Sequence, residues 1–585
     1  MAIIVGSILG GTLWHISGTT YLKGMLSTFS SHQELVDFLK MRPEDVPQSL
    51  FQRFLSAFQQ LTNNGQTGFF PPGLERDLSA AESGGTPEYS TTNIQVEGVD
   101  EADIVKNDEE FLYLVSGSTV YILAAYPPET ATILSKIETK DAIVGIFVNE
   151  DKLVVFQNYY GPDIYGPEIA FRTYLPYYGS AKTTITIYDI SDRSTPMVER
   201  EVTVDGHYMT SRMMGDYVYV VANNPVYLVN DTVNLPEIRS GNSTMLVDPT
   251  NIYHTELPDY YHYFTNIIVI DLTDAEQVPK SESYLLGATS CVYVSRENIY
   301  LVSYGTNIHR ISVKDGDITH TASGSVAGYV LNQFSMDEYN GYFRIATTTG
   351  NWGATTFNHL YILDSNLNIV GKVEDLAQGE RIYSARFMGD KGFIVTFRQI
   401  DPLFVIDLSN PTNPQVLGYL KIPGVSDYLH PYDENHLIGI GRDATDEGRI
   451  TGMKLSLFDI TDVSNPTEIS KYIIGEQGTY SEALYDHKAF LFSKSKQLLV
   501  IPIQLSEDGK WNVWQGAYVF TVMEESISFT GRITHLENRM DVSEDSSRYV
   551  KRALFIDDVL YTISDKTVKM NSLVDLKEIG SVTLS

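Results

Sequence analysis

Cysteine is nearly absent from this chain of 585 residues, and its absence limits how the fold can be held together. Cys291 is the single thiol, so neither an intrachain disulfide nor a metal site built from several cysteines can form. Basic residues are also scarce: 42 lysines and arginines stand against 74 aspartates and glutamates, a formal net charge of −32. Because such an acidic protein would repel phosphate groups, we expect no nucleic acid among its partners.

Several catalytic signatures are missing as well. The sequence contains no G-x-S-x-G nucleophile elbow, no H-E-x-x-H zinc motif and no P-loop. A site built from His207, His430 and His535 is conceivable, but these residues belong to separated units, and ordinary hydrogen-bonded histidines are the simpler interpretation. We therefore expect binding in preference to catalysis, and no cofactor apart from a calcium ion considered below.

The first 90 residues differ from the rest and divide into three segments. Residues 1–20 include the apolar run MAIIVGSILGGTLW, which has the length of the core of an export signal and is too short to cross a bilayer. This run predicts a signal or membrane anchor, with a buried N-terminal segment as the alternative. Residues 21–64 predict two helices, the first opened by a capping box of Ser31 and Glu34. Residues 65–90 are rich in glycine, proline and serine and predict a linker.

Residues 91–585 show no sustained helical periodicity and repeat one hairpin pattern instead. A short polar or acidic turn precedes an alternating apolar strand rich in Tyr, Val, Ile and Phe. The copies are NDEEFLYLV (107–115), NEDKLVVF (149–156), MGDYVYVV (214–221), SRENIYLV (295–302), EYNGYFRI (338–345), MGDKGFIVTF (388–397), YDENHLIGI (432–440), YDHKAFLF (485–492) and IDDVLYTI (556–563). Their strands begin about forty residues apart or more, the spacing of four-stranded propeller blades with insertions. The predicted fold is all-β: a β-propeller of eight or nine blades with a small N-terminal α-helical segment.

A second repeated pattern marks the outer half of the predicted blades. It occurs as YDISDRSTP (188–196), IDLTDAEQVP (270–279), IDLSNPTNP (406–414) and FDITDVSNP (458–466). Short oxygen-bearing side chains bond the local backbone in such turns, and proline fixes φ in an outer strand. We place these turns between the third and fourth strands of a blade. A calcium loop is the weaker alternative, because no distal bidentate glutamate follows.

Long insertions fall between the second and third strands of four modules, at 158–182, 223–265, 441–452 and 503–516. In a propeller blade these loops share a face with the connections between consecutive blades. We call this face the elaborated face. The opposite, plain face should carry the hairpin tips, including the tip that contains His487.

Tyrosines crowd the first two of these insertions. The candidate binding residues are Tyr159, Tyr160, Tyr165, Tyr177, Tyr178, Tyr260 and Tyr261. Tyrosine offers a large, stiff contact area with a polar tip, which suits protein or carbohydrate surfaces. The alternative is that these rings pack on one another to hold long loops in place.

The acidic stretch VEGVDEADIVKND (96–108) precedes and enters the first strand of the first blade. Asp100, Glu101 and Asp103 should therefore lie near the mouth of the central channel, on the elaborated face. Crowded carboxylates repel one another unless a cation, an arginine or a backbone amine neutralises them. We take Ca²⁺ as a candidate metal for these three residues. The alternative is a solvated acidic lead-in that is partly bonded to neighbouring strands.

The segment TTNIQVEGVDEADIVKND, followed by YLVSGSTVYILAAYP (113–127), resembles the opening signature of a family of secreted β-propeller proteins. This family is known mainly from prokaryotes, especially archaea, and is distantly related to WD-repeat proteins. The segments DHKAFLF (486–492), LLVIPI (498–503), WQGAYVF (514–520) and GRITH (531–535) resemble its later blades. The resemblance implies export, often with an N-terminal anchor, and therefore an extracellular or membrane-anchored location facing outside. It supplies no catalytic residues.

These patterns predict an exported or cell-surface binding or scaffold module. It would act through its Tyr-rich elaborated face on a protein or carbohydrate at the cell surface. Two alternatives stay open: a propeller-type hydrolase or lyase that uses carboxylates at the channel mouth, and a structural envelope protein.

Overall fold

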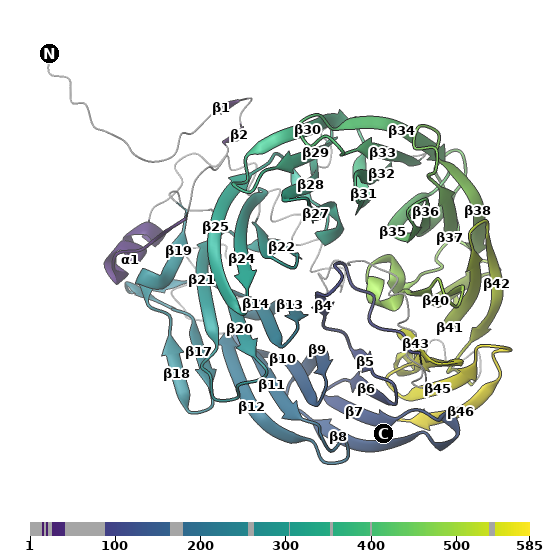
Figure 1. Cartoon of the computed structure of the whole chain (residues 1–585), viewed down its shortest axis with the longest axis horizontal. Coiled ribbons are helices and arrows are strands. Elements are labelled where there is room, and N and C mark those ends of the chain that lie inside the picture. Colours follow the sequence, from purple (N-terminus) through teal and green to yellow (C-terminus); the bar gives the residue numbers. More distant parts are fainter. Residues whose placement is uncertain are drawn as a thin grey trace.

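Antiparallel sheets follow one another around a central channel and close into a ring (Figure 1). The computed structural model describes residues 15–16, 19–20, 26–40, 88–163, 179–255, 262–303, 305–350, 355–397, 401–537 and 545–584. Within these ranges there are nine sheets of four or more strands. The chain is therefore a β-propeller, and the described sheets number within the predicted range.

Each blade is a meander whose strands succeed one another from the channel outward (Figure 1). Blade 1 consists of β5 (Val105–Asn107), β6 (Phe111–Ser116), β7 (Thr119–Ala124) and β8 (Thr132–Glu138). Blade 2 consists of β9 (Ala142–Asn149), β10 (Lys152–Asp163), β11 (Gly179–Asp189) and β12 (Met197–Asp205). Blade 3 consists of β13 (His207–Met214), β14 (Tyr217–Pro225), β20 (Tyr263–Asp271) and β21 (Lys280–Leu286). Blade 4 consists of β22 (Thr289–Val294), β23 (Asn298–Ser303), β24 (Asn307–Lys314) and β25 (Asp317–Ser325). Blade 5 consists of β27 (Met336–Tyr339), β28 (Tyr342–Thr349), β29 (Phe357–Leu363) and β30 (Ile369–Leu376), and β26 (Tyr329–Val330) also pairs with β28. Blade 6 consists of β31 (Arg381–Met388), β32 (Lys391–Phe397), β33 (Asp401–Asp407) and β34 (Gln415–Ile422). Blade 7 consists of β35 (Val425–Asp433), β36 (His436–Ala444), β37 (Ile450–Asp459) and β38 (Thr467–Ile474). Blade 8 consists of β39 (Leu491–Ser493), β40 (Leu498–Glu507), β41 (Lys510–Met523) and β42 (Ser526–Ile533). Blade 9 consists of β43 (Arg552–Ile556), β44 (Val559–Ile563), β45 (Thr567–Ser572) and β46 (Glu578–Thr583).

Blades 2 and 3 carry additional strands. On the outside these are β17 (Glu237–Ser240) and β18 (Ser243–Leu246) in blade 2, and β19 (Ile252–His254) and β3 (Ser27–Thr28) in blade 3. On the channel side, β4 (Asp100–Glu101) pairs with β13. Separate two-stranded sheets are formed by β1 (His15–Ile16) with β2 (Thr19–Thr20), and by β15 (Leu228–Val229) with β16 (Thr232–Val233). Short 3₁₀ turns are η1 (Pro128–Thr130), η2 (Pro249–Asn251), η3 (Gln333–Ser335), η4 (Glu482–Leu484), η5 (His487–Ala489) and η6 (Ser546–Arg548).

The N-terminal helix α1 (His32–Lys40) begins at the predicted capping box. Ser31 Oγ accepts a hydrogen bond from the Glu34 N–H at 3.2 Å, and the Glu34 carboxylate accepts one from the Ser30 N–H at 2.6 Å. The inward face of the helix buries Leu35 and Phe38 in a cluster formed by blades 2 and 3. The rest of the predicted helical lead, from residue 41 to 64, lies outside the described residues. No helix among the described residues is long and apolar enough to cross a membrane.

Apolar side chains of adjacent blades pack together to form the core. The alternation predicted from sequence puts one set of residues of each strand against the preceding blade and the other set against the next. The same packing joins the two ends of the ring: Leu112 and Leu114 of blade 1 share a cluster with Leu554, Ile556 and others of blade 9. All four strands of each of these two blades are consecutive in the chain, so side-chain packing rather than a shared sheet joins them.

The Asp-rich turns join the third and fourth strands, as predicted. Between β11 and β12, Asp189 Oδ1 accepts a hydrogen bond from the Ser191 N–H at 2.9 Å, and Asp192 Oδ1 accepts one from the Ser194 N–H at 2.9 Å. Equivalent bonds occur in blades 3, 6 and 7. These aspartates therefore stabilise turns, which is the turn mechanism inferred from the sequence.

One predicted hairpin is wrong. Residues 485–492 do not surround a hairpin tip; they contain η5 and the start of the first strand of blade 8, and the tip lies at 494–497. Two side chains cap the 3₁₀ turns before this strand: Ser481 Oγ accepts from the Ala483 N–H and Asp486 Oδ1 from the Lys488 N–H. An acidic capped turn followed by apolar residues thus imitates the hairpin pattern. His487 consequently lies buried beside the channel and not on the plain face.

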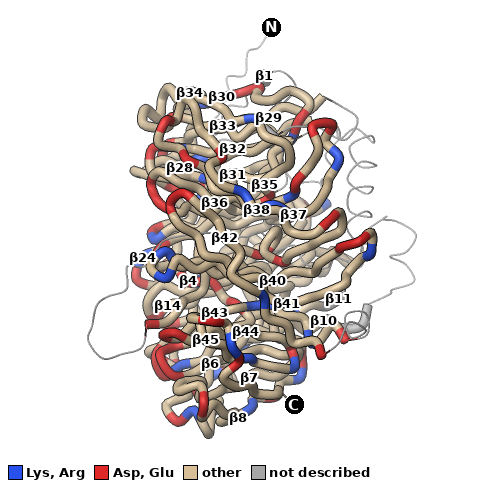
Figure 2. Tube along the Cα trace, turned by 90° about the vertical axis from the view of Figure 1, so that its right-hand side faces the viewer, with Lys and Arg blue, Asp and Glu red and all other residues tan. Residues whose placement is uncertain are grey.

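The four predicted insertions all join second to third strands: β10 to β11, β14 to β20, β36 to β37 and β40 to β41. Because successive strands are antiparallel, these connections share the elaborated face with the links between blades. Acidic residues, by contrast, occur throughout the coloured part of the trace and are not confined to one blade (Figure 2). The charge therefore does not mark out a single surface.

Docking of α1 can be tested with Phe38→Ala. The Phe38 ring packs edge-on against Phe29 and His254, with ring centroids 5.5 and 5.0 Å apart. Alanine favours helix more than phenylalanine does, so any loss of protection must come from lost packing, worth about 3–5 kcal/mol. We expect faster hydrogen–deuterium exchange in residues 26–40 and unchanged exchange in blades 5 to 8. Unaltered exchange in residues 26–40 would show that the helix is held by other contacts.

Candidate functional site at the channel mouth

Residues 88–104 run along the channel side of the ring, and we call them the channel segment (Figure 1). At its start, the Ser90 N–H donates to Phe555 O of blade 9 at 3.0 Å. The Asn93 side chain then donates to His487 O at 3.1 Å, before the first strand of blade 8. The next residues therefore pass the inner edges of the blades and not the outer rim.

The second half of the channel segment continues in the reverse order of the blades. The Gln95 side chain donates to Gln333 O, before blade 5, at 3.0 Å. Arg296 of blade 4 donates to Glu97 O at 2.7 Å. β4 then pairs with blade 3, and Asp103 forms a β-bridge with Ile146 of blade 2. The stretch that opens the fold thus touches most blades before it enters blade 1.

Each of the three predicted metal ligands has a protein cation beside it. Asp100 Oδ1 lies 2.7 Å from Lys106 Nζ, and Glu101 Oε2 lies 3.5 Å from Arg212 Nη2. Asp103 Oδ1 lies 3.0 Å from Arg552 Nη2. The repulsion that motivated the calcium hypothesis is therefore relieved by the protein itself. Calcium binding at these residues stays a prediction.

Arg552 is the centre of the charge network. Besides Asp103, its guanidinium binds Glu482 Oε1 at 3.0 Å and the Asp486 carboxylate. Burial opposes the charge of Arg552, but these carboxylates outweigh burial and raise its pKa well above the ordinary value. Burial likewise acts to raise the pKa of Asp486, yet Arg552 and Lys488 hold it well below its usual range. Both groups are therefore ionised at neutral pH.

His487 lies between two of these acids without a close hydrogen bond. Its Nε2 is 3.7 Å from Glu101 Oε2, and its Nδ1 is 3.7 Å from Asp486 Oδ1. Burial lowers the pKa of His487 to about 3 despite the nearby carboxylates. The imidazole is therefore neutral at neutral pH, and it is fully buried rather than available to a ligand.

A cavity of about 340 Å³ lies at the channel mouth. Its walls include the first residues of β13, β22 and β43, which follow the links between blades, so it belongs to the elaborated face. Its charged lining consists of four acids and four bases: Glu101, Asp103, Glu482, Asp486, Arg212, Lys488, Lys551 and Arg552. These charges balance, so the cavity is locally neutral although the chain is strongly acidic.

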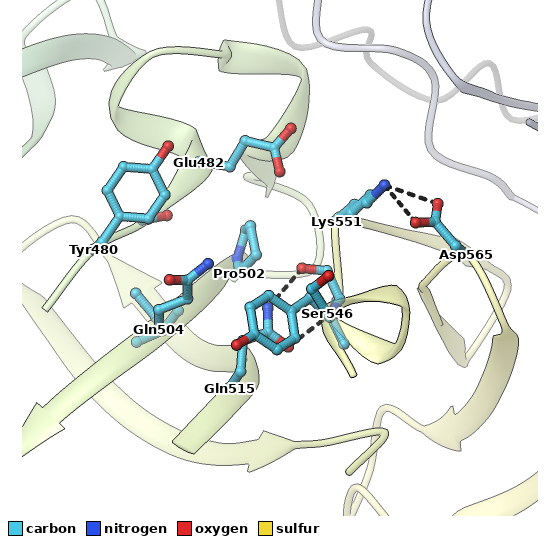
Figure 3. A pocket seen from close by; sticks show the side chains of 12 residues that line it. Tyr480, Glu482, Pro502, Gln504, Gln515, Ser546, Lys551 and Asp565 are labelled. Carbon is cyan, nitrogen blue, oxygen red and sulfur yellow. Dashed lines mark hydrogen bonds and ion pairs between the residues drawn. The ribbon is translucent and has the colours of Figure 1, made fainter. Parts of the chain in front are cut away.

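A second cavity, of about 310 Å³, lies between blades 8 and 9 and shares Glu482 and Lys551 with the first. Tyr480, Glu482 and Gln504 form one side of it, and Lys551 and Asp565 stand on the other (Figure 3). Its residues come from β40, β41, the loop that precedes β43 and other loops beside them, which also belong to the elaborated face. We call this cavity the blade 8–9 cleft.

Asp427 of β35 differs from the acids of the network. Burial raises its pKa to about 6, although Arg442 Nη2 lies 3.0 Å from its Oδ1. Asp427 lines neither of the two cavities.

The structure describes only part of the predicted tyrosine surface. Tyr159 lies in β10 with 39% of its surface exposed, and the backbone of Tyr160 follows in the same strand. Tyr165, Tyr177, Tyr178, Tyr260 and Tyr261 lie outside the described residues. Binding by these tyrosines stays a prediction.

The three candidate histidines are buried or half-buried in ordinary surroundings. His535 is hydrogen-bonded through both ring nitrogens, to Ser564 Oγ and Thr562 Oγ1, each at 2.9 Å. Burial lowers the pKa values of His207, His430 and His535.

A different set of potential metal ligands was missed in the sequence. Asp433, His436 and Glu524 place one ligand atom each within 4.8 Å of one another, at hairpin tips of blades 7 and 8. Lys494 Nζ already lies 2.8 Å from Asp433 Oδ2, so a cation of the protein occupies this position.

Sequence reasoning also missed the cations of the channel mouth. Arg212, Lys488 and Arg552 come from blades 3, 8 and 9, and no local motif surrounds them. A pairing such as Asp103 with Arg552 joins residues 449 positions apart. Only the order of blades around the ring brings them together.

A family model for the beta propeller domain matches residues 89–576. A protein of Methanocaldococcus jannaschii described as uncharacterised is 32% identical over 569 residues, covering 83% of this chain and 82% of the relative. Another uncharacterised protein, of Archaeoglobus fulgidus, is 29% identical over 628 residues, covering 96% and 94%.

Two solved structures show a distant likeness. BamB from Moraxella catarrhalis is 10% identical with a TM-score of 0.26, and the match covers 64% of this chain and 100% of BamB. Hsv2 from Kluyveromyces lactis is 13% identical with a TM-score of 0.30, covering 60% and 95%. Scores this low carry no inference about the site.

The ion pair between the channel segment and blade 9 can be tested with Arg552→Met. Removing Arg552 leaves buried Asp103 without its cation, while Asp486 keeps Lys488, and should lower the free energy of unfolding by about 3–5 kcal/mol. Lys569→Met is the control, because its pair with Glu578 is more exposed and should contribute about 1 kcal/mol or less. Urea denaturation measures both. An Arg552→Met protein as stable as Lys569→Met would contradict the role of the pair.

His535 should make stability depend on pH. Because burial lowers its folded-state pKa to about 3, the unfolded chain binds a proton near pH 6.5 while the folded chain does not. Stability contributed by His535 is therefore present above pH 6.5 and is lost as the pH falls towards 3. The free energy of unfolding of His535→Gln, measured by denaturation at pH 7 and pH 5, should fall less than that of the native chain. Parallel losses would contradict a neutral, buried His535.

Proposed function

Because the chain belongs to the family of beta-propeller domains, we propose that it is a binding module that takes its ligand on the elaborated face, around the channel mouth. One observation carries the proposal: both of these cavities lie on the face of the ring where the four strand connections that carry the long insertions begin and end. Ligand sites occur preferentially in such concave regions, where loops are held by a rigid scaffold.

The charge network supports binding over catalysis. A hydrolase or lyase that uses a pair of carboxyl groups needs their pKa values pushed apart, so that one group carries a proton. At the channel mouth, Arg212 and other cations outweigh burial and lower the pKa of Glu101, and Asp486 is lowered as well. Both acids are paired with protein cations and are not held protonated for transfer to a substrate.

We extend the proposal to location and partner. The apolar run at residues 1–20 and the resemblance of the opening signature to secreted propellers support an exported protein, free or anchored with the ring facing outside. A partner there would be a protein or a carbohydrate. A purely structural envelope role would require no ligand at the channel mouth, so a binding experiment separates the two.

The experiment blocks one face at a time. Ser290 is exposed and lines the channel-mouth cavity, whereas Asn366 is exposed in the turn between β29 and β30 on the plain face. The native protein, Ser290→Trp and Asn366→Trp are screened on one array of glycans and peptides. We expect ligands whose binding falls about tenfold or more in Ser290→Trp and is unchanged in Asn366→Trp.

Three results would overturn this proposal. They are the absence of any ligand on the array, equal effects of the two substitutions, and turnover by the native protein in a panel of esterase, peptidase and lyase assays.

A further inference from the structure

The blade 8–9 cleft contains polar groups that the fold does not use. Among the described residues, the Gln504 side-chain amide and the Tyr480 hydroxyl have no hydrogen-bond partner, although both line the cleft. Glu482 accepts a hydrogen bond from Arg552 through Oε1, and its Oε2 can accept a further bond. The cleft therefore presents an amide, a phenol and a carboxylate oxygen, which together offer both donors and acceptors.

Other lining groups are fully engaged and make the wall rigid. Gln515 binds both the N–H and the carbonyl oxygen of Val550, at 2.8 and 2.9 Å. Lys551 Nζ contacts both carboxylate oxygens of Asp565, at 2.8 and 2.7 Å (Figure 3). A rigid wall beside polar groups that can still form hydrogen bonds is the arrangement expected of a preorganised ligand site.

Aromatic rings flank the same cleft. The rings of Tyr480 and Tyr485 are stacked, with centroids 6.0 Å apart and an interplanar angle of 22°, and Tyr485 is 47% exposed. Trp511, on the β40–β41 hairpin, is 73% exposed and lies close against Gly478. The next residue, Asn512, donates to the hydroxyl of cleft residue Tyr549 at 2.8 Å. A tryptophan this exposed on a described, hydrogen-bonded hairpin is typical of a contact surface.

The charge of the cleft defines the class of ligand. Two acids and one base line the cleft: Lys551 pairs with Asp565, and Glu482 is bound by Arg552, which lies outside the lining. Both acids are therefore already paired with cations of the protein. A neutral ligand therefore fits better than a phosphate or a cation. Sugar rings have a C–H face that packs on aromatic rings and hydroxyl groups that both donate and accept hydrogen bonds. A volume of about 310 Å³ is at the small end of ligand pockets, which suits one or two such rings.

We propose that the blade 8–9 cleft binds a neutral sugar residue of a glycan. Gln504 and Glu482 would bond its hydroxyl groups, while Trp511 and Tyr485 contact the sugars that continue beyond the cleft. This inference deepens the proposed function and rests on it.

The experiment uses the full chain and an array of neutral oligosaccharides together with peptides. Gln504→Ala removes an unbonded amide, and Trp511→Ala removes an exposed ring, so neither should unfold the protein. Tyr419→Ala is the control, because Tyr419 is 56% exposed on outer strand β34. We expect glycan binding to weaken about tenfold or more in each cleft variant and to stay unchanged in the control.

The outcomes separate the two proposals. Peptide binding that Ser290→Trp abolishes, without binding of any neutral glycan, would overturn the sugar site and leave the proposed function standing. Glycan binding that survives both Gln504→Ala and Trp511→Ala would also overturn the sugar site, since the glycan would then bind elsewhere. If neither class of ligand binds, both proposals fail. Should one cleft variant not fold, the other decides the result.

Discussion

The contact between Asp103 and Arg552 is the constraint on which the ring depends. Asp103 precedes the first strand of blade 1, Arg552 begins the first strand of blade 9, and their atoms meet at 3.0 Å. Among the described residues, no strand of blade 1 pairs with a strand of blade 9. The seam is otherwise held by apolar packing, by the β-bridge between Tyr89 and Ile556, and by bonds such as Tyr561 Oη to Ala125 O at 2.8 Å. A buried pair is costly to break once one partner is lost, so the seam requires all its charges together.

This method of closure decides where a ligand can bind. Polar groups of the channel segment form hydrogen bonds with the inner edges of the blades, and its acids form ion pairs with lysine and arginine side chains. The channel interior is therefore built into the fold. Two cavities of the described residues lie on the elaborated face, the channel-mouth cavity and the blade 8–9 cleft. In the cleft, polar groups without a protein partner lie near exposed aromatic rings. The groups that close the ring and the groups proposed to bind are neighbours, joined through Glu482.

Sequence patterns predicted the parts of the fold that depend on local chemistry. Alternating strands, the Asp189 and Asp192 type of turn, and the Ser31 cap all follow from residues within a few positions of one another. The error at His487 has the same origin, since a capped 3₁₀ turn and a hairpin share a local pattern. The Asp103 to Arg552 pair could not be predicted, because it depends on how many blades separate two residues. The cleft lies between two blades and was hidden for the same reason.

The net charge of −32 reflects the acids of the Asp-rich turns more than the charge of the candidate site. In the Asp-rich turns, hydrogen bonds from backbone and side-chain groups lower the pKa values of Asp189, Asp192 and Asp459, so these acids stay ionised at neutral pH. In the lining of the channel-mouth cavity, by contrast, four acids and four bases balance. The total charge therefore argues against nucleic acid at long range, while the ligand proposed for the cleft would be selected at short range by hydrogen bonds and ring contacts. A ligand suited to this chain need not be cationic, although composition alone would suggest one.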